Sequence, residues 1–150
     1  MIKKNIIIIF LIFIFNGCGF APVYLKSNNI NFSIEQIDYT GDRELNNFLK
    51  VNLRQYKNEK NNNKIFIEAK SKYEKIILSK DGTGKVTNYR LQTEVIFLIR
   101  STNKIIKITE EKIIDSVNDK FEEVRNERSA KQNFAYSISN KLISELIVNQ

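Results

Sequence analysis

SKDGTGKVTNYRLQTEVIFLI (Ser79–Ile99) contains a short glycine-bearing turn followed by a long alternating segment. The glycines of Asp81–Gly84 can adopt positive φ, which is typical of a β-hairpin turn. After the turn, apolar side chains recur at odd positions, and polar ones occupy even positions such as Arg90, Gln92, Glu94 and Arg100. This period of two predicts a strand with one buried face. That face comprises Tyr89, Leu91, Val95, Phe97 and Ile99.

Three more strands are predicted around this one. Residues 64–79 alternate in the same way, through Ile65, Ile67, Ala69, Ser71 and Tyr73. Their phase drifts at Glu74–Ile76, which favours a bulge there. STNK (Ser101–Lys104) is a second turn and leads into a strand that ends near Ile113. A weaker alternation at Phe32–Thr40 predicts the first strand of the chain.

Two segments have helical periodicity instead. In GDRELNNFLKVNLRQY (Gly41–Tyr56), the apolar positions recur at helical spacing, and Asp42 is suited to be the N-cap. The second helix is predicted over residues 118–148, with Glu122 and Glu123 near the positive end of its dipole. Its apolar stripe comprises Ala130, Phe134, Ile138, Leu142 and Leu146.

The predicted order is β-α-β-β-β-α, in one domain over residues 32–150. Each helix has one apolar stripe, so both can pack on the same face of a sheet. The predicted fold class is therefore α+β, a four-stranded, mostly antiparallel sheet with two helices on one face.

The first seventeen residues differ from the rest. Lys3 and Lys4 precede ten uninterrupted apolar residues, Ile6–Phe15. A membrane-spanning helix needs about 20 such residues, whereas a secretory signal needs fewer. We interpret residues 1–17 as an export signal; a short anchor or a buried N-terminal strand is the alternative.

Cys18 is the one cysteine of the chain, so no internal disulfide can form. Its possible roles are a free thiol, an intermolecular disulfide or a lipid attachment point. The chain has no histidine, the usual partner in thiol catalysis. Gly17-Cys18-Gly19 after an apolar run resembles the bacterial lipoprotein box, which implies that Cys18 is acylated and becomes the mature N-terminus. Gly19 resembles the sorting pattern for the outer membrane. Residues 18–31 are then a lipidated tether.

The sequence has few of the residues that catalysis or cofactor binding requires. Histidine is absent, no glycine-rich phosphate loop follows a strand, and no metal-ligand spacing occurs. Glu110 and Glu111 are adjacent in a predicted strand, so their side chains point to opposite faces. We therefore expect no enzyme activity and no cofactor. A hydrolase that uses converging carboxylates is the competing class.

The charge of the chain is +7 at pH 7, which favours acidic partners. Export leaves anionic lipids or phosphorylated sugars as better candidates than nucleic acid. Lysines flank the predicted hairpin tip, and further cations lie early in the second helix. If the hairpin projects past the helix start, these cations could form one end of the fold that binds phosphates. The alternative is an ordinary solvated surface. These cations are Lys75, Lys80, Lys85, Arg125, Arg128 and Lys131.

Four segments resemble the LptE family of lipopolysaccharide-assembly lipoproteins. They are GCGFAPVY after the signal, YTGDRELNNFLKVNL, the long hairpin, and RNERSAKQNFAYSISNKLISELI. The resemblance covers nearly the whole mature chain. It implies an outer-membrane lipoprotein on the periplasmic side that plugs the LptD β-barrel, assists its assembly and helps deliver lipopolysaccharide to the outer leaflet.

The same resemblance implies where lipopolysaccharide is bound. In the family, basic residues at the hairpin tip and at the entry to the second helix are implicated. By position these are Lys80 and Arg125, and we add their neighbours Lys85 and Arg128 as candidates. The alternative function is a lipoprotein interaction module with a different envelope partner.

Overall fold

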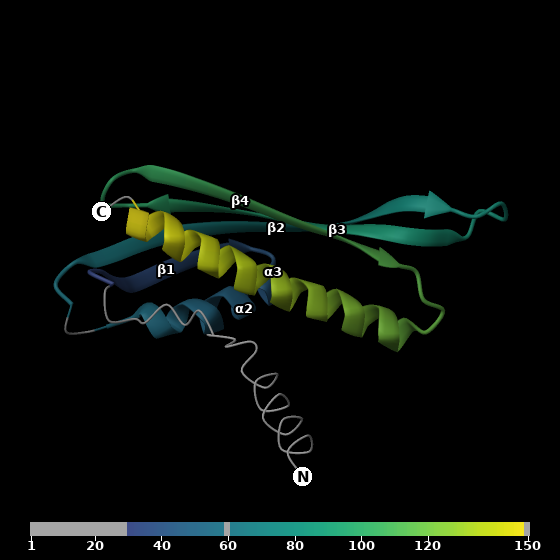
Figure 1. Ribbon diagram of the computed structural model, residues 1–150, viewed down its shortest axis with the longest axis horizontal. Coiled ribbons are helices and arrows are strands. Elements are labelled where there is room, and N and C mark those ends of the chain that lie inside the picture. The colour runs from purple at the N-terminus through teal and green to yellow at the C-terminus, as the bar shows by residue number, and fades with distance from the viewer. Residues whose placement is uncertain (1–29, 59–60, 149–150) are drawn as a thin grey trace, which may run out of the picture.

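The computed structural model describes residues 30–58 and 61–148, which form a helical layer against one sheet (Figure 1). The strands are β1 (Ser33–Gly41), β2 (Lys64–Lys80), β3 (Val86–Ile99) and β4 (Lys104–Asp115). The helices are α2 (Arg43–Leu53), continued by the 3-10 turn η2 (Arg54–Tyr56), and α3 (Lys120–Val148). The predicted order β-α-β-β-β-α and the α+β class are confirmed. The predicted signal, Cys18 and most of the tether lie outside the described residues.

Among the described residues, the sheet has the order β1-β2-β3-β4. β2 pairs antiparallel with β3, and β3 with β4, whereas β1 runs parallel to β2. Because a parallel pair cannot be closed by a tight turn, the chain crosses back through α2. The sheet is therefore mixed, with a mostly antiparallel pairing as predicted.

The core lies between the sheet and the two helices, which cover the same face (Figure 1). The odd-numbered residues of β3 face it as predicted, and Leu91, Val95 and Phe97 are fully buried. The predicted stripe of α3, from Ala130 to Leu146, is also buried. Burial of these apolar side chains is the main source of stability.

Helix α2 begins where the sequence predicts. The side chain of Asp42 accepts a hydrogen bond from the backbone N–H of Leu45 at 2.8 Å, so Asp42 is the N-cap. The preceding residue, Gly41, has a φ of +98°, and a Cβ there would lie 1.8 Å from the carbonyl oxygen of Ser71. Only glycine fits where β1 ends this close to β2.

The β2–β3 hairpin extends beyond β1 and α2, with α3 running beside it (Figure 1). The register of β2 against β3 shifts between Ile77 and Ser79 and again between Ser79 and Lys80. The bulge predicted at Glu74–Ile76 therefore lies a few residues nearer to the tip. There it increases the local twist of the hairpin.

Candidate functional site

The tip of the β2–β3 hairpin is organised by Asp81. One carboxylate oxygen accepts hydrogen bonds from the N–H and the hydroxyl of Thr83, at 2.9 and 2.6 Å, and from the N–H of Lys85 at 3.0 Å. These hydrogen bonds lower the pKa of Asp81, and the bonds from Thr83 contribute most. Gly84 supplies the φ of +85° that the turn needs. The tip is thus a defined turn that fixes the positions of the lysines beside it.

Two of the predicted site residues, Lys80 and Lys85, flank this turn. Lys80 is exposed, and its side chain has no polar partner among the described residues. The ammonium of Lys85 donates to the side-chain oxygen of Asn118 at 2.7 Å, which connects the hairpin to the loop before α3. The structure therefore places Lys85 close to the start of α3.

Lys75, further back on β2, is neutralised by α3. Its ammonium pairs with the carboxylate of Glu123, lies 3.2 Å from that of Glu127, and sits 4.5 Å from the centre of the Tyr89 ring. Its side chain is 23% exposed, so these contacts are partly shielded from solvent. Lys75 thus attaches α3 to the hairpin, which leaves little of its charge for a ligand.

Glu123 gives this attachment a pH dependence. Lys75 first, and then Lys120, lower the pKa of Glu123 below its ordinary value. A lowered pKa in the folded state contributes stability that is present above the unfolded-state pKa and is lost as pH falls through the folded-state pKa. Glu123→Gln should therefore lower the free energy of unfolding by about 1–2 kcal/mol at neutral pH and flatten its decline between pH 5 and 3. Urea unfolding at a series of pH values measures both effects.

The control is Glu122→Gln, which removes the same charge one position away. The side chain of Glu122 has no ion-pair partner among the described residues. If the free energy of unfolding declined equally in both variants as the pH falls, the pairing of Lys75 with Glu123 would not stabilise the fold.

The two predicted arginines lie on a different side of α3. Glu123 and Glu127 turn toward the sheet, so Arg125, two residues from each, points away from it. Arg125 is exposed and has no ion-pair partner in the described part of the chain. Arg128 lies against α2, with its guanidinium 3.6 Å from the Glu44 carboxylate and 6.0 Å from the centre of the Phe48 ring. The hairpin lysines and Arg128 therefore do not form one cluster.

The sequence groups Lys131 with these surface cations, but in the structure Lys131 is buried. Its ammonium lies 3.3 Å from Asp42 and 3.2 Å from Glu44, over the Tyr73 ring at 4.1 Å from the centre. Burial raises the pKa of Tyr73, with a further contribution from the Glu127 carboxylate. The spacing along the helix could have predicted this burial. Lys131 precedes Phe134 and Ile138 by three and seven residues, so it lies on the same buried stripe.

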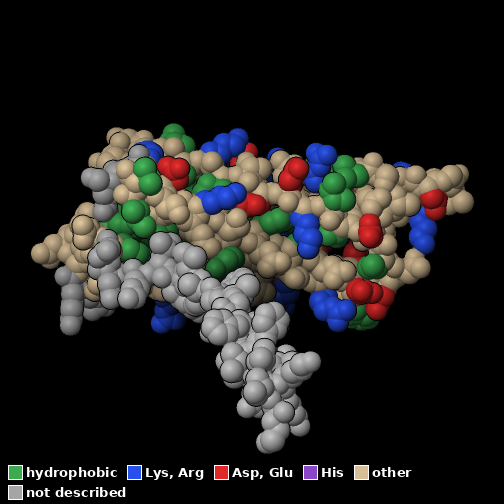
Figure 2. Space-filling model, in the orientation of Figure 1, with side chains coloured by type: hydrophobic (Ala, Val, Ile, Leu, Met, Phe, Trp, Pro, Cys, Tyr) green, Lys and Arg blue, Asp and Glu red, His purple; other side chains and the backbone are tan. Residues whose placement is uncertain are grey.

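Charge is distributed over the surface. Acidic and basic side chains alternate across the face in Figure 2, so neither sign forms a continuous patch there. On the sheet face away from the helices, Arg100 pairs with Asp38 and, at 3.0 Å, with Glu68, while Lys107 lies 2.7 Å from Glu94. Such pairs carry little net charge. The same face also exposes apolar side chains, among them Phe66, Ile105 and Ile113.

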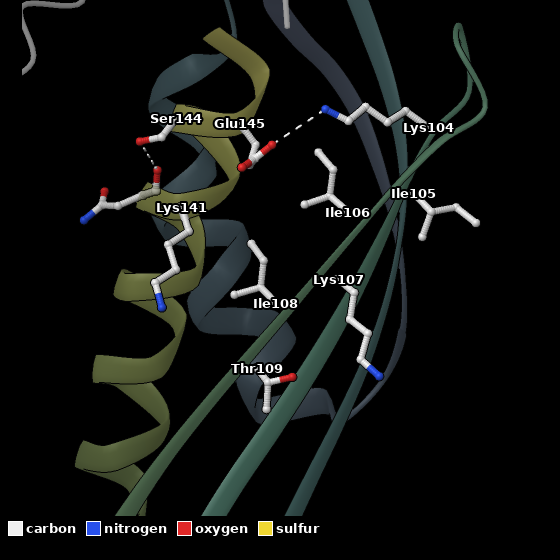
Figure 3. A pocket seen from close by; sticks show the side chains of 10 residues that line it. Lys104, Ile105, Ile106, Lys107, Ile108, Thr109, Lys141, Ser144 and Glu145 are labelled. Atoms are coloured by element: carbon white, nitrogen blue, oxygen red, sulfur yellow. Dashed lines mark hydrogen bonds and ion pairs between the residues drawn. The ribbon is translucent and has the colours of Figure 1, made fainter. Parts of the chain in front are cut away.

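An open groove of about 660 Å³ lies between β4 and the second half of α3. Figure 3 shows Ile106 and Ile108 pointing from β4 toward α3, whereas Ile105 and Lys107 point away from it. Lys104 forms an ion pair with Glu145 across the groove at 3.6 Å. No sequence pattern predicts this groove, because it depends on how α3 packs against the sheet edge.

Two negative findings hold for residues 30–58 and 61–148. No group of three or more His, Cys, Asp or Glu side chains there could hold a metal ion. No helix in that part of the chain is long and apolar enough to cross a membrane.

The fold occurs in solved bacterial lipoproteins. Rare lipoprotein B from Shewanella oneidensis aligns with a TM-score of 0.55 at 15% identity, over 76% of this chain and 95% of that one. A minor lipoprotein from Acinetobacter baumannii aligns with a TM-score of 0.50 at 19% identity, over 73% of this chain and 93% of that one. An uncharacterized lipoprotein B from Nitrosomonas europaea aligns with a TM-score of 0.51 at 14% identity, over 76% of this chain and 83% of that one.

These likenesses establish a shared fold. No family model matches the chain, and no curated protein matches its sequence.

Proposed function

We propose that this chain is an outer-membrane lipoprotein that plugs and helps assemble an LptD β-barrel. In that role it takes part in lipopolysaccharide transport to the outer leaflet. The observation that carries the proposal is the shared fold, because all three neighbours above are described as lipoproteins. The lipobox-like sequence around Cys18 supports the same conclusion independently. Acylation of Cys18 would hold the chain on the periplasmic side of the membrane.

The surface of the domain supports a plug. The sheet face away from the helices carries paired charges such as Arg100 with Asp38 and Glu68. The lumen of a membrane β-barrel is polar, so these paired charges can lie against it. The role is scaffolding and binding, and we propose no enzymatic step and no cofactor.

Depletion of the protein tests this function. We expect LptD to be misassembled and lipopolysaccharide to be lost from the cell surface, as measured by heat-modifiability of LptD and by surface labelling. Expression of the wild-type gene should restore both, whereas Cys18→Ser should yield an unacylated product that is not retained in the membrane. Normal LptD and lipopolysaccharide after depletion, with a different partner in affinity purification, would favour the alternative interaction module.

Lipopolysaccharide binding is proposed at Lys80, Lys85, Arg125 and Arg128. Lys80 and Arg125 are the strongest candidates, since both are exposed and neither side chain has an ion-pair partner among the described residues. Lys80→Ala with Arg125→Ala should weaken binding about ten-fold at low salt, because two charge-assisted contacts to phosphate are lost. Fluorescence titration with lipopolysaccharide measures the affinity.

The matched control is Lys50→Ala with Lys70→Ala. It removes the same charge from exposed positions on α2 and β2, away from the hairpin tip. Equal losses in the two double variants would indicate attraction by net charge alone, and the site assignment would be wrong.

A further inference from the structure

A second groove lies between β1 and helix α2, at the edge of the sheet opposite β4. We call it the α2 groove, and its volume is about 260 Å³. Its walls are apolar, because Ile34 and Leu53 are buried there and Ile37 and Tyr39 are half-buried against the core. Sites that enclose a whole small molecule have about 300–1,000 Å³, so this groove suits part of one apolar chain.

A bulge in β1 forms one wall of the α2 groove. The register against β2 shifts between Ile34 and Gln36, so Ile34 and Ile37 both face the helices although they are three residues apart. In a regular strand, residues three apart face opposite sides of the sheet. The bulge therefore adds a second apolar side chain to the groove where α2 ends.

The rim of the α2 groove carries positive charge that the chain does not balance. Lys50 and Arg54 line the groove, are exposed, and have no ion-pair partner within residues 30–58 and 61–148. The carboxylate of the lining belongs to Glu35, which lies 3.6 Å from the ammonium of Lys57 and 3.4 Å from that of Lys64. Two ammonium groups thus share this carboxylate, and the other two cations of the rim have none.

Helix stability does not account for this charge. Arg43, Lys50 and Arg54 are spaced by seven and four residues, so they lie on one face of α2. Lys50 and Arg54, near the C-terminus, interact favourably with the helix dipole, but Arg43 in the first turn does not. Arg43 also has no ion-pair partner in the described part of the chain, and it lines a further hollow that Tyr39 and Lys50 share with the α2 groove. A row of unpaired cations beside an apolar cavity indicates an anionic ligand with an apolar part.

The α2 groove lies at the end of the domain where the described chain begins. Ile30 lines a small hollow together with Tyr56 of η2, and the hydroxyl of Ser33 accepts a hydrogen bond from the N–H of Asn58 at 2.7 Å. Cys18 precedes Ile30 by twelve residues, which span at most about 40 Å. Acylation of Cys18 would therefore keep the headgroups of the membrane within reach of the groove, a step that rests on the proposed function.

We propose that the α2 groove binds an anionic phospholipid of this membrane. Part of one acyl chain lies against Ile34, Ile37 and Leu53, and the headgroup phosphate pairs with Lys50 and Arg54 on the rim. The groove is too small for the several acyl chains of lipopolysaccharide, so this site is separate from the cations proposed above for that ligand. A bound lipid would hold α2 against the leaflet, an orientation that goes beyond the proposed function.

NMR of the unacylated full-length chain in neutral detergent micelles tests this site. The probe is phosphatidylglycerol with a nitroxide at the end of one acyl chain, and phosphatidylcholine with the same label is the comparison. We expect the labelled phosphatidylglycerol to broaden the side-chain resonances of Ile34, Ile37 and Leu53 at about one tenth of the mole fraction that phosphatidylcholine requires.

The groove beside β4 is an internal control. It also has apolar walls, from Ile106 and Ile108, but each of its three lysines pairs with a carboxylate. Broadening of the Ile106 and Ile108 resonances should therefore be the same with either lipid.

A double variant removes the charge of the rim. Lys50→Gln with Arg54→Gln should abolish the ten-fold preference for phosphatidylglycerol, and circular dichroism checks that both exposed substitutions leave the helices intact. The matched control is Lys70→Gln with Lys112→Gln, which removes the same charge from exposed positions on β2 and β4 that have no ion-pair partner among the described residues. This control should keep the preference.

Three outcomes would overturn the proposal. One is equal broadening of the α2 groove by the two lipids in the unaltered protein. Another is an equal loss of preference in the two double variants, which would indicate attraction by net charge alone. The third is displacement of the labelled phosphatidylglycerol by unlabelled lipopolysaccharide or by an acidic peptide at equal concentration, which would assign the groove to that ligand. Because the protein is unacylated, none of these outcomes depends on the anchor at Cys18 or on the barrel partner.

Discussion

Gly41→Ala is expected to lower the free energy of unfolding by about 3–5 kcal/mol, a large part of the stability of a domain of this size. The new methyl carbon would lie 1.8 Å from the carbonyl oxygen and 2.8 Å from the carbonyl carbon of Ser71. Both are backbone atoms of a paired strand, so neither can turn aside. The end of β1 would have to move, and with it Asp42, which caps α2. Urea unfolding followed by circular dichroism measures the loss.

Gly84→Ala is the matched control for backbone conformation. Gly84 has a similar φ, +85°, but no atom lies within 4 Å of the position that a Cβ would occupy. Its substitution should therefore cost about 1 kcal/mol, the strain of a left-handed alanine. If Gly41→Ala were no more destabilising than Gly84→Ala, the close approach of β1 to Ser71 would be disproved.

Lys131→Ala is expected to cost about 2–4 kcal/mol. The variant loses a buried aliphatic stem, the contact with the Tyr73 ring, and the charge that faces Asp42 and Glu44. The Asp42 side chain is 22% exposed, so its carboxylate would be left partly desolvated without a partner. The measurement is equilibrium unfolding at low and at high salt, since a buried pair is screened little by salt.

Two further variants separate packing from charge. Lys131→Met keeps most of the side-chain volume and should cost about 1–2 kcal/mol less than the alanine variant. Arg128→Ala removes a side chain that is 69% exposed, with its guanidinium 3.6 Å from the same Glu44 carboxylate, and should cost less than about 0.5 kcal/mol. Equal effects for Lys131→Ala and Arg128→Ala would show that Lys131 does not bridge α3 and α2.

The features predicted correctly from sequence have local causes. The hairpin at Asp81–Gly84 follows from its own glycines and carboxylate, and the start of α2 follows from the side chain of Asp42. The buried faces of β3 and α3 follow from periodicity along single segments. In each case, the residues that decide the structure lie within a few positions of one another.

The features that the sequence did not reveal depend on distant segments. The alternation of β2 weakens before the bulge, but the bulge forms at Ile77–Lys80, where the pairing with β3 decides it. Lys131 lies on the apolar stripe of α3, but the two carboxylates beside it, Asp42 and Glu44, come from the distant start of α2. Likewise, the direction of Arg128 depends on α2, so the spacing of cations along the chain could not predict which of them cluster.

The length of β2 sets the reach of the molecule. Its seventeen residues begin opposite Ser33, where the described chain enters the sheet, and end beside the hairpin tip. At about 3.3 Å per residue, the strand is a stiff arm of roughly 55 Å, well beyond the thickness of a hydrocarbon layer at about 30 Å. A ligand held at Lys80 would therefore lie far from the point where the described chain enters the sheet.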